Sequence, residues 1–188
     1  MKAAVRRWSL LLLAIVAAVV LFFLSRSAAG QGEYGFMPKG GRDLLLELLG
    51  PANAEELRKI ATTRRTEAQW RTFVTARKKT LSEREVATLT AYLAVNMPLA
   101  ETVVKQDNIA AALPRDGRQL AWDQCQFCHS LFSSHLTQDR DVQGWRNMFQ
   151  SPFHRELKMT PQEREEFSRY SALNMPMKID DVPQDLRF

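Results

Sequence analysis

The feature that most constrains the fold of this chain is a helical pattern that occurs twice. The stretch "SEREVATLTAYLAVNMP" covers residues 82–98, and "TPQEREEFSRYSALNMP" covers residues 160–176. Each stretch begins with a hydroxyl residue that is followed three residues later by glutamate, the capping box that starts a helix. Each ends in Asn-Met-Pro, and proline does not continue a helix. We therefore expect two similar helices, one in each copy of an internal repeat.

The second of these helices has the clearer signals. Thr160 is a strong N-cap and Pro161 stands at the first helical position, so the helix is predicted to run to about Leu173. Phe167, Tyr170 and Leu173 are spaced by three and give it one apolar face.

Tryptophans extend the repeat toward the N-terminus. Trp70 and Trp145 lie at similar distances before the two caps, and each is expected to open a short helical stretch. Repeat one then covers residues 42–100, repeat two covers residues 115–180, and residues 103–118 join them. Apolar residues of repeat one that recur at helical spacing predict its core: Leu57, Ile60, Ala61, Trp70, Phe73 and Val74. The predicted fold is all-α, with two helical domains.

The chain has two cysteines, and they stand in one short motif. In "DQCQFCHSLF", residues 123–132, Cys125 and Cys128 are separated by two residues, and His129 follows directly. This C-x-x-C-H order is typical of covalent haem attachment, in which each thiol adds to one vinyl group and the histidine binds iron. The motif therefore favours one covalent haem c.

Three other interpretations of the motif remain open from the residues alone. A disulfide between Cys125 and Cys128 would close a very short loop and would stabilise little of the fold. A thioredoxin-like site would need a strand before the motif, and no β-branched alternating stretch precedes Cys125. A zinc site would need a fourth ligand, which His135 or His154 would supply from no recognised spacing.

The pattern of residues 1–29 indicates an export signal. Lys2, Arg6 and Arg7 precede a largely apolar run from Trp8 to Leu24, and small residues follow at positions 27–29. The length of the run fits both a slightly long signal peptide and a short membrane anchor, so we expect one or the other. The arginines before the run keep the start cytoplasmic. The rest of the chain is then predicted to be periplasmic or on the outer face of the cytoplasmic membrane.

Composition excludes some partners. The chain of 188 residues carries a formal charge of +5, of which residues 1–29 supply four basic residues and no acid. No concentrated basic patch remains elsewhere, so a nucleic-acid partner is not expected. No paired carboxylates, Ser-His-Asp order or glycine-rich phosphate loop stands out in the sequence. We therefore expect an electron-transfer protein and not an enzyme in its own right.

The C-x-x-C-H motif, the tryptophan helix and the capped helix with "YSALNMP" together resemble a class I c-type cytochrome domain, over about residues 118–176. The resemblance implies a haem held by Cys125 and Cys128, with His129 as the proximal iron ligand. Repeat one is similar to the same domain, but "GPANAEELRKI", residues 50–60, stands where the motif should fall and contains no cysteine or histidine. We therefore expect one haem per chain.

The sixth iron ligand has four candidates. The resemblance implies a methionine between the tryptophan helix and the last helix, which nominates Met148 first and Met159 second. Met175 is matched by Met97 in the repeat without haem, which favours a packing role. His154 in "SPFHREL" would instead give a bis-histidine iron of lower potential.

The expected function is one-electron transfer with redox protein partners, either as a free cytochrome or as a subunit of a larger oxidoreductase complex. Membrane anchoring is expected if residues 1–29 are retained. The alternatives are a haem-based sensor with an open sixth position and a structural interaction subunit.

Overall fold

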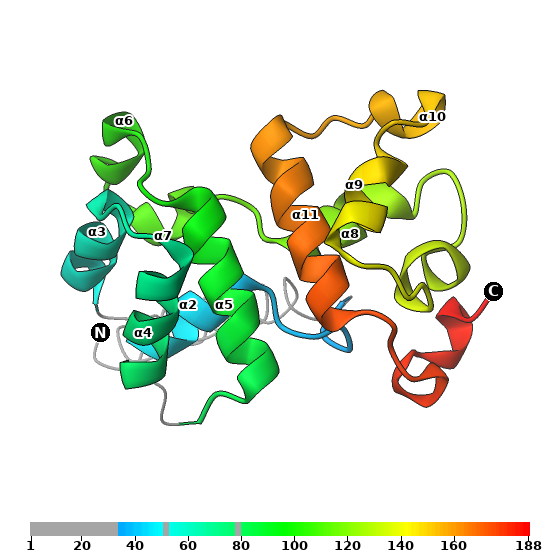
Figure 1. Ribbon diagram of the computed structural model, residues 1–188, viewed down its shortest axis with the longest axis horizontal. Helices are drawn as coiled ribbons and strands as arrows, with labels where there is room; N and C mark the ends of the chain where they lie inside the picture. The colour runs from blue at the N-terminus through cyan, green and yellow to red at the C-terminus, as the bar shows by residue number, and fades with distance from the viewer. Residues whose placement is uncertain (1–33, 51–52, 78–79) are drawn as a thin grey trace, which may run out of the picture. The chain divides into compact units, whose positions relative to one another are not determined.

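The computed structural model describes residues 34–50, 53–77 and 80–188, which form helices and loops with no strand among them (Figure 1). The predicted all-α fold is confirmed. Residues Met37–Phe188 form one compact unit that contains both repeats, and the division into two domains stays a prediction. The signal or anchor predicted for residues 1–29 lies outside the described residues. Within the described part, no helix has the length and apolar character needed to cross a membrane.

The two repeats have the same order of principal helices. Repeat one contains α2 (Gly41–Leu49), α3 (Ala54–Thr62), α4 (Glu67–Arg77) and α5 (Glu83–Asn96). Repeat two contains α8 (Gly117–Cys125), a π-helical turn η1 (Phe132–Leu136), α9 (Val142–Met148), α10 (Pro152–Arg155) and α11 (Pro161–Asn174). Between the repeats lie α6 (Glu101–Val104) and α7 (Ile109–Ala112), and two 3₁₀ turns end the chain, η2 (Ile179–Asp181) and η3 (Gln184–Leu186).

Local capping explains where the main helices begin. Both predicted capping boxes are present, with Ser82 before α5 and Thr160 before α11. In the second box the Glu163 amide donates to the Thr160 hydroxyl at 3.2 Å, and the Thr160 amide donates to the Glu163 carboxylate at 2.9 Å. Trp70 and Trp145 do lie in helices, but α4 and α9 start three residues before them. The prediction that each tryptophan opens its helix was therefore slightly wrong.

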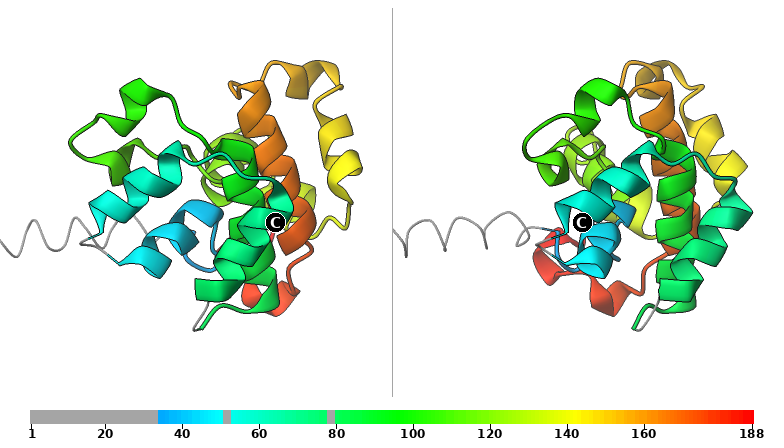
Figure 2. Two further views of the ribbon diagram at one scale, coloured as in Figure 1. Left: turned by 60° about the vertical axis from the view of Figure 1, so that its left-hand side comes forward. Right: turned by 90° about the vertical axis from the view of Figure 1, so that its left-hand side faces the viewer.

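Helices α5 and α11 pack side by side at the centre of the unit (Figures 1 and 2). Helices α2 and α4 pack on α5, and α8 and α9 pack on α11. Each central helix therefore contacts helices of its own repeat and the central helix of the other repeat.

Glycines allow the first helix of each repeat to approach the last one closely. A Cβ atom added at Gly41 would lie 2.1 Å from the Cβ of Tyr92, and one added at Gly117 would lie 2.0 Å from the Cβ of Tyr170. No side chain fits at those separations, so glycine is required at the same place in both repeats.

The same two tyrosines connect the repeats to each other. The Tyr92 hydroxyl donates to the carbonyl oxygen of Pro114 at 2.9 Å, and the Tyr170 hydroxyl donates to that of Pro38 at 2.7 Å. Pro38 precedes α2 and Pro114 precedes α8, each by three residues. Each tyrosine therefore bonds to the segment that leads into the other repeat.

A second pair of contacts has the same reciprocity. The Asn96 amide donates to the Glu166 carboxyl group at 3.4 Å, and the Asn174 amide donates to the Thr88 hydroxyl at 3.1 Å. Thr88 and Glu166 occupy equivalent positions of α5 and α11 when the two capped helices are aligned. The repeats therefore meet through one self-complementary surface, as two subunits do across a two-fold axis.

The interiors of the two repeats differ. Repeat one holds a continuous apolar cluster, which includes all six residues predicted from helical spacing. Ile109 and Leu113, from the segment that joins the repeats, are buried in the same cluster. The interior of repeat two contains an aromatic cluster around Trp145 and Phe167, with a cavity beside it.

Candidate functional site

The C-x-x-C-H motif lies where α8 ends. Asp116 starts this helix with a capping box to Gln119, and Cys125 is its last residue. Both cysteines are free thiols, Cys125 half-buried and Cys128 exposed. Burial raises the pKa of the Cys125 thiol to about 12, so this group stays protonated at neutral pH.

A cavity of about 420 Å³ opens beside the motif, within the size range of cofactor sites. Cys125, Cys128 and His129 all line it. Its apolar lining consists of Trp145, Met148, Phe153, Leu157 and Phe167. Its polar lining consists of Gln124, Ser133, Ser134, His135, Gln138, Arg140 and His154. The cavity is therefore amphipathic.

Its apolar wall is rigidly packed. The rings of Trp145 and Phe167 meet edge to face with centroids 5.7 Å apart, and the rings of Phe149 and Phe167 do so at 5.6 Å. All three side chains are buried. Edge-to-face aromatic pairs hold a defined geometry, so this wall offers a preformed apolar surface.

The sequence did not reveal where His135 lies, because the motif suggested it only as a possible zinc ligand. Its ring is buried against Trp145 and Phe167, and its Nε2 atom lies 2.9 Å from the Ser171 hydroxyl. Burial lowers the pKa of His135 to about 3, so the imidazole is neutral. Its Nδ1 atom has no hydrogen-bond partner in the described part of the chain. A buried polar atom without a partner is costly, and a polar group of a bound ligand would relieve that cost.

Arg140 places a positive charge at the same cavity. Its guanidinium lies 5.2 Å from the ring centroid of Trp145 and donates to the Gln138 side chain at 3.2 Å. Haem is a flat apolar macrocycle with two carboxylates. The aromatic wall suits the macrocycle, and Arg140 with His135 suits the carboxylates. The residues at the cavity therefore fit a haem.

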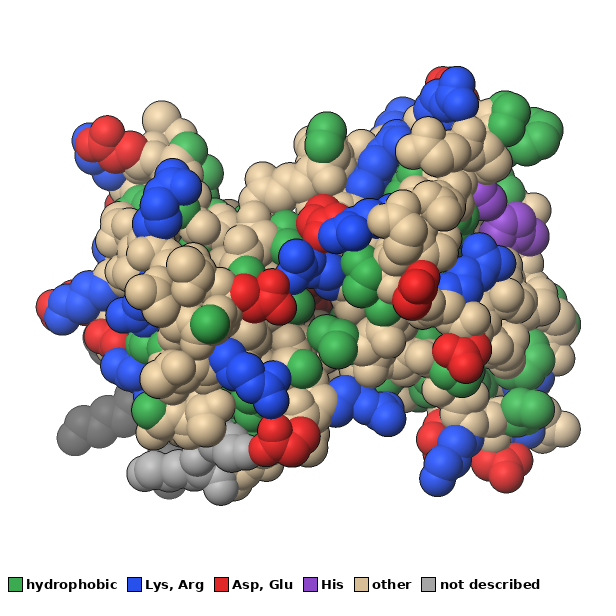
Figure 3. Space-filling view, in the orientation of Figure 1, with side chains coloured by type: hydrophobic (Ala, Val, Ile, Leu, Met, Phe, Trp, Pro, Cys, Tyr) green, Lys and Arg blue, Asp and Glu red, His purple; other side chains and the backbone are tan. Residues whose placement is uncertain are grey.

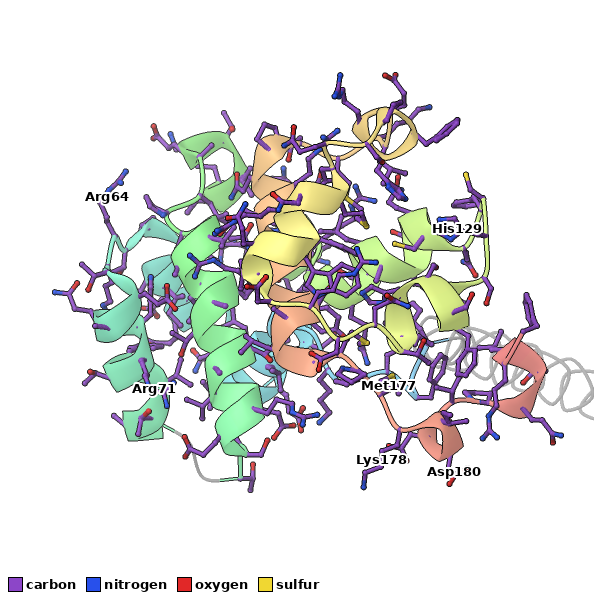
Figure 4. All side chains as sticks on the ribbon, turned by 45° about the vertical axis from the view of Figure 1, so that its right-hand side comes forward. Arg64, Arg71, His129, Met177, Lys178 and Asp180 are labelled. Atoms are coloured by element: carbon purple, nitrogen blue, oxygen red, sulfur yellow. The ribbon has the colours of Figure 1, made fainter. Side chains whose placement is uncertain are left out.

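His129 is exposed and lies on the opposite side of the unit from Arg64 and Arg71 of repeat one (Figure 4). Histidine side chains are visible together on this face (Figure 3). The ring of His154 is the neighbour of His129, with ring centroids 6.0 Å apart and planes inclined by 76°. The structure thus brings two imidazoles from different elements to one cavity.

The four candidates for the sixth iron ligand separate into two groups. Met148, at the end of α9, and His154, in α10, both line the cavity and are half-buried. Met159 and Met175 are buried, 7% and 6% exposed, and neither belongs to the cavity lining. These two flank α11, before its N-cap and at its C-cap, where they contribute to packing.

A second hollow, of about 350 Å³, lies along the same loop. It is bordered by Cys128 and His129 and by residues such as Trp122 and Phe188. Cys125 does not line it. Because attachment of a haem by this motif uses both thiols, the first cavity is the better match.

The corresponding place in repeat one offers no thiol or imidazole. The Leu99 amide donates to the Ala61 carbonyl at 2.8 Å, as the Met177 amide donates to that of Leu136 at 2.7 Å, so α3 corresponds to the region of η1. Helix α3 buries Leu57 and Ile60, each 3% exposed, in the apolar cluster. A hollow of about 430 Å³ is also present in repeat one. It is bordered by Leu49, Gly50, Asn53 and Ala54, from the stretch that corresponds to the motif, and its lining contains no cysteine or histidine.

Comparison of the chain with protein-family models, with curated proteins and with solved structures finds no match. Among the described residues, no group of three or more His, Cys, Asp and Glu side chains is placed to hold a metal ion. The site is therefore interpreted from its own residues.

Proposed function

We propose that this chain is an exported c-type cytochrome with one covalent haem, held by Cys125 and Cys128 in repeat two and bound at iron by His129. The observation that carries the proposal is the convergence of both thiols and this imidazole on one amphipathic cavity of about 420 Å³. The proposed function is one-electron transfer, which the haem supplies when bound by cycling between ferric and ferrous iron.

The residues of the chain have separate roles in this proposal. The packed ring of Phe167 and the ring of Trp145 exclude water from one side of the cavity, which tunes the potential of a bound haem. Arg140 and His135, which line the cavity, would hold the carboxylates of the haem. The exposed motif loop, with Phe127 78% exposed, would leave an edge of the haem open to a redox protein partner.

Repeat one has no role at the iron in this proposal. Its core is a continuous apolar cluster, and its hollow contains no thiol or imidazole. Its central helix α5 supports α11, which carries Phe167 at the cavity wall. We propose that it acts as a scaffold, in a free cytochrome or in a subunit of a larger oxidoreductase. The periplasm or the outer face of the cytoplasmic membrane is the proposed location.

Cysteine variants test the attachment. The wild-type chain is expressed with a haem-attachment system, then denatured and extracted with acid and organic solvent. Haem should stay with the wild-type polypeptide, while Cys125→Ala and Cys128→Ala should each retain much less and the double variant none. Ser130→Ala, in the same loop, serves as the matched control and should retain haem fully. Release of all haem from the denatured wild type would contradict the proposal.

A further inference from the structure

We propose that His154 is the second axial ligand, so that the iron of this protein is held between two imidazoles, His129 and His154. The inference rests on the proposed function, because it requires a haem at the motif. It differs from the ligand that the class I resemblance implies, which is a methionine.

The first observation is the distance between the two rings. Imidazoles bonded on opposite sides of one metal have ring centroids about 6 Å apart, given metal–nitrogen bonds of about 2.0 Å. The centroids of His129 and His154 are 6.0 Å apart. The two side chains come from different elements, the motif loop and α10, and both line the same cavity. Their separation is therefore that of an axial pair.

The second observation is the hydrogen bond that orients His154. Its Nδ1 atom lies 2.8 Å from the Ser151 hydroxyl, at the N-cap of α10. A histidine that binds metal through Nε2 carries its proton on Nδ1 and usually donates it to a neighbouring acceptor. The Ser151 hydroxyl can accept that proton, in the tautomer that leaves Nε2 of His154 available for iron.

The third observation is that α10 is fixed to the rest of repeat two. Arg164, on α11, donates to the carbonyl oxygens of Arg155 at 2.7 Å and of Met159 at 3.2 Å. Arg155 in turn donates to the carbonyl oxygen of Gln150 at 2.8 Å. These bonds tie the segment on both sides of His154, so its ring is held at the cavity by more than its own short helix.

Met148 is the competing ligand. It also lines the cavity and follows Trp145 by one turn of α9. A thioether is a good ligand for haem iron and raises the reduction potential relative to a second histidine. The two assignments therefore predict different spectra and different potentials, which makes them separable.

The experiment compares the wild-type holoprotein with His154→Ala and with Met148→Leu as the matched control at the same cavity. Electron paramagnetic resonance and near-infrared magnetic circular dichroism of the ferric protein distinguish imidazole from thioether ligation. The wild type and Met148→Leu should both show two imidazoles. His154→Ala should lose this signature and become high-spin, and added imidazole should restore it, which shows that the variant is folded.

Ser151→Ala tests the orienting hydrogen bond. It should keep two imidazoles at the iron and raise the reduction potential, because the bond from Nδ1 makes His154 a more basic ligand. A thioether signature in the wild type that disappears in Met148→Leu would overturn the inference, and so would a high-spin wild type. Intact mass of each denatured sample separates this failure from that of the proposed function: haem still attached means that only the ligand assignment is wrong.

Discussion

Glu166 shows at the scale of one residue how the two repeats depend on each other. Its carboxyl group is buried between them, 2% exposed, and accepts hydrogen bonds from the Gly117 amide at 3.1 Å and the Asn96 side chain at 3.4 Å. Burial, with a smaller effect from the charge of Asp116, raises the pKa of Glu166 to about 8. The folded protein therefore holds a proton there at neutral pH.

This proton makes stability depend on pH. Between the unfolded pKa of 4.5 and the folded value of about 8, the native state binds a proton that the unfolded state releases, so the free energy of unfolding falls as pH rises. Glu166 should therefore make the holoprotein less stable to urea at pH 8 than at pH 5, while His135, with its lowered pKa, acts in the opposite direction below pH 6.5. Glu166→Gln should reduce that difference, by up to about 1.4 kcal/mol per pH unit.

Glu165→Gln is the control for Glu166. The hydrogen bond from Arg146 is the main cause that lowers the pKa of Glu165 to about 2, so this group contributes stability that is lost only below pH 4.5. The variant should therefore keep the difference between pH 5 and pH 8. An unchanged pH dependence in Glu166→Gln would mean that Glu166 is ionised in the folded protein.

At the scale of one helix, the crossing of α8 and α11 depends on Gly117. A methyl group there would overlap the Tyr170 side chain, so the helix that carries Cys125 would have to move away from α11. Gly117→Ala should lower the free energy of unfolding by about 1–3 kcal/mol or more, as other overpacked sites do. Thermal unfolding of the holoprotein measures this.

Gly144→Ala is the matched helical control. An added Cβ atom there comes no closer than 3.2 Å to side-chain atoms of Arg140 and Asp141, so its effect should stay within about 1 kcal/mol. Equal effects of the two substitutions would show that the contact with Tyr170 does not determine the packing of α8.

Helix boundaries illustrate what the sequence can predict. The boxes at Ser82 and Thr160 are local, with donor and acceptor three residues apart, and the predicted helix end near Leu173 is within one residue of the end of α11. The similar box at Asp116, which positions Cys125, is just as local and was overlooked. The short α10 begins with Ser151 and Pro152 but lacks a glutamate three residues after the cap, so the capping-box rule could not predict it.

At the scale of the whole unit, the sequence could predict that there are two repeats but not how they combine. The bonds from Tyr92 to Pro114 and from Tyr170 to Pro38 join residues 22 and 132 positions apart. No local pattern distinguishes such an exchange from contacts within one repeat. The same holds for His135, whose burial beside Trp145 follows from tertiary packing.

Some residues of the site could be predicted from the sequence, and others could be found only from the fold. Cys125, Cys128 and His129 could be predicted because they form one short motif whose spacing is typical of haem attachment. The neighbour of His129 across the cavity is His154, which belongs to a later element, and only the fold brings the two rings together. The assignment of Met148 as sixth ligand stays a prediction that the spectra of the variants will test.

We infer that the two repeats share one architecture but differ in function, with the haem in repeat two and an apolar core without cysteine or histidine in repeat one. The measurement that tests it most directly is the number of haems per chain, from the intact mass of the denatured holoprotein and from iron and haem quantified against protein. The account predicts one covalent haem and one iron per chain, attached to a peptide that contains Cys125 and Cys128. Two haems per chain, or none that survives denaturation, would contradict it.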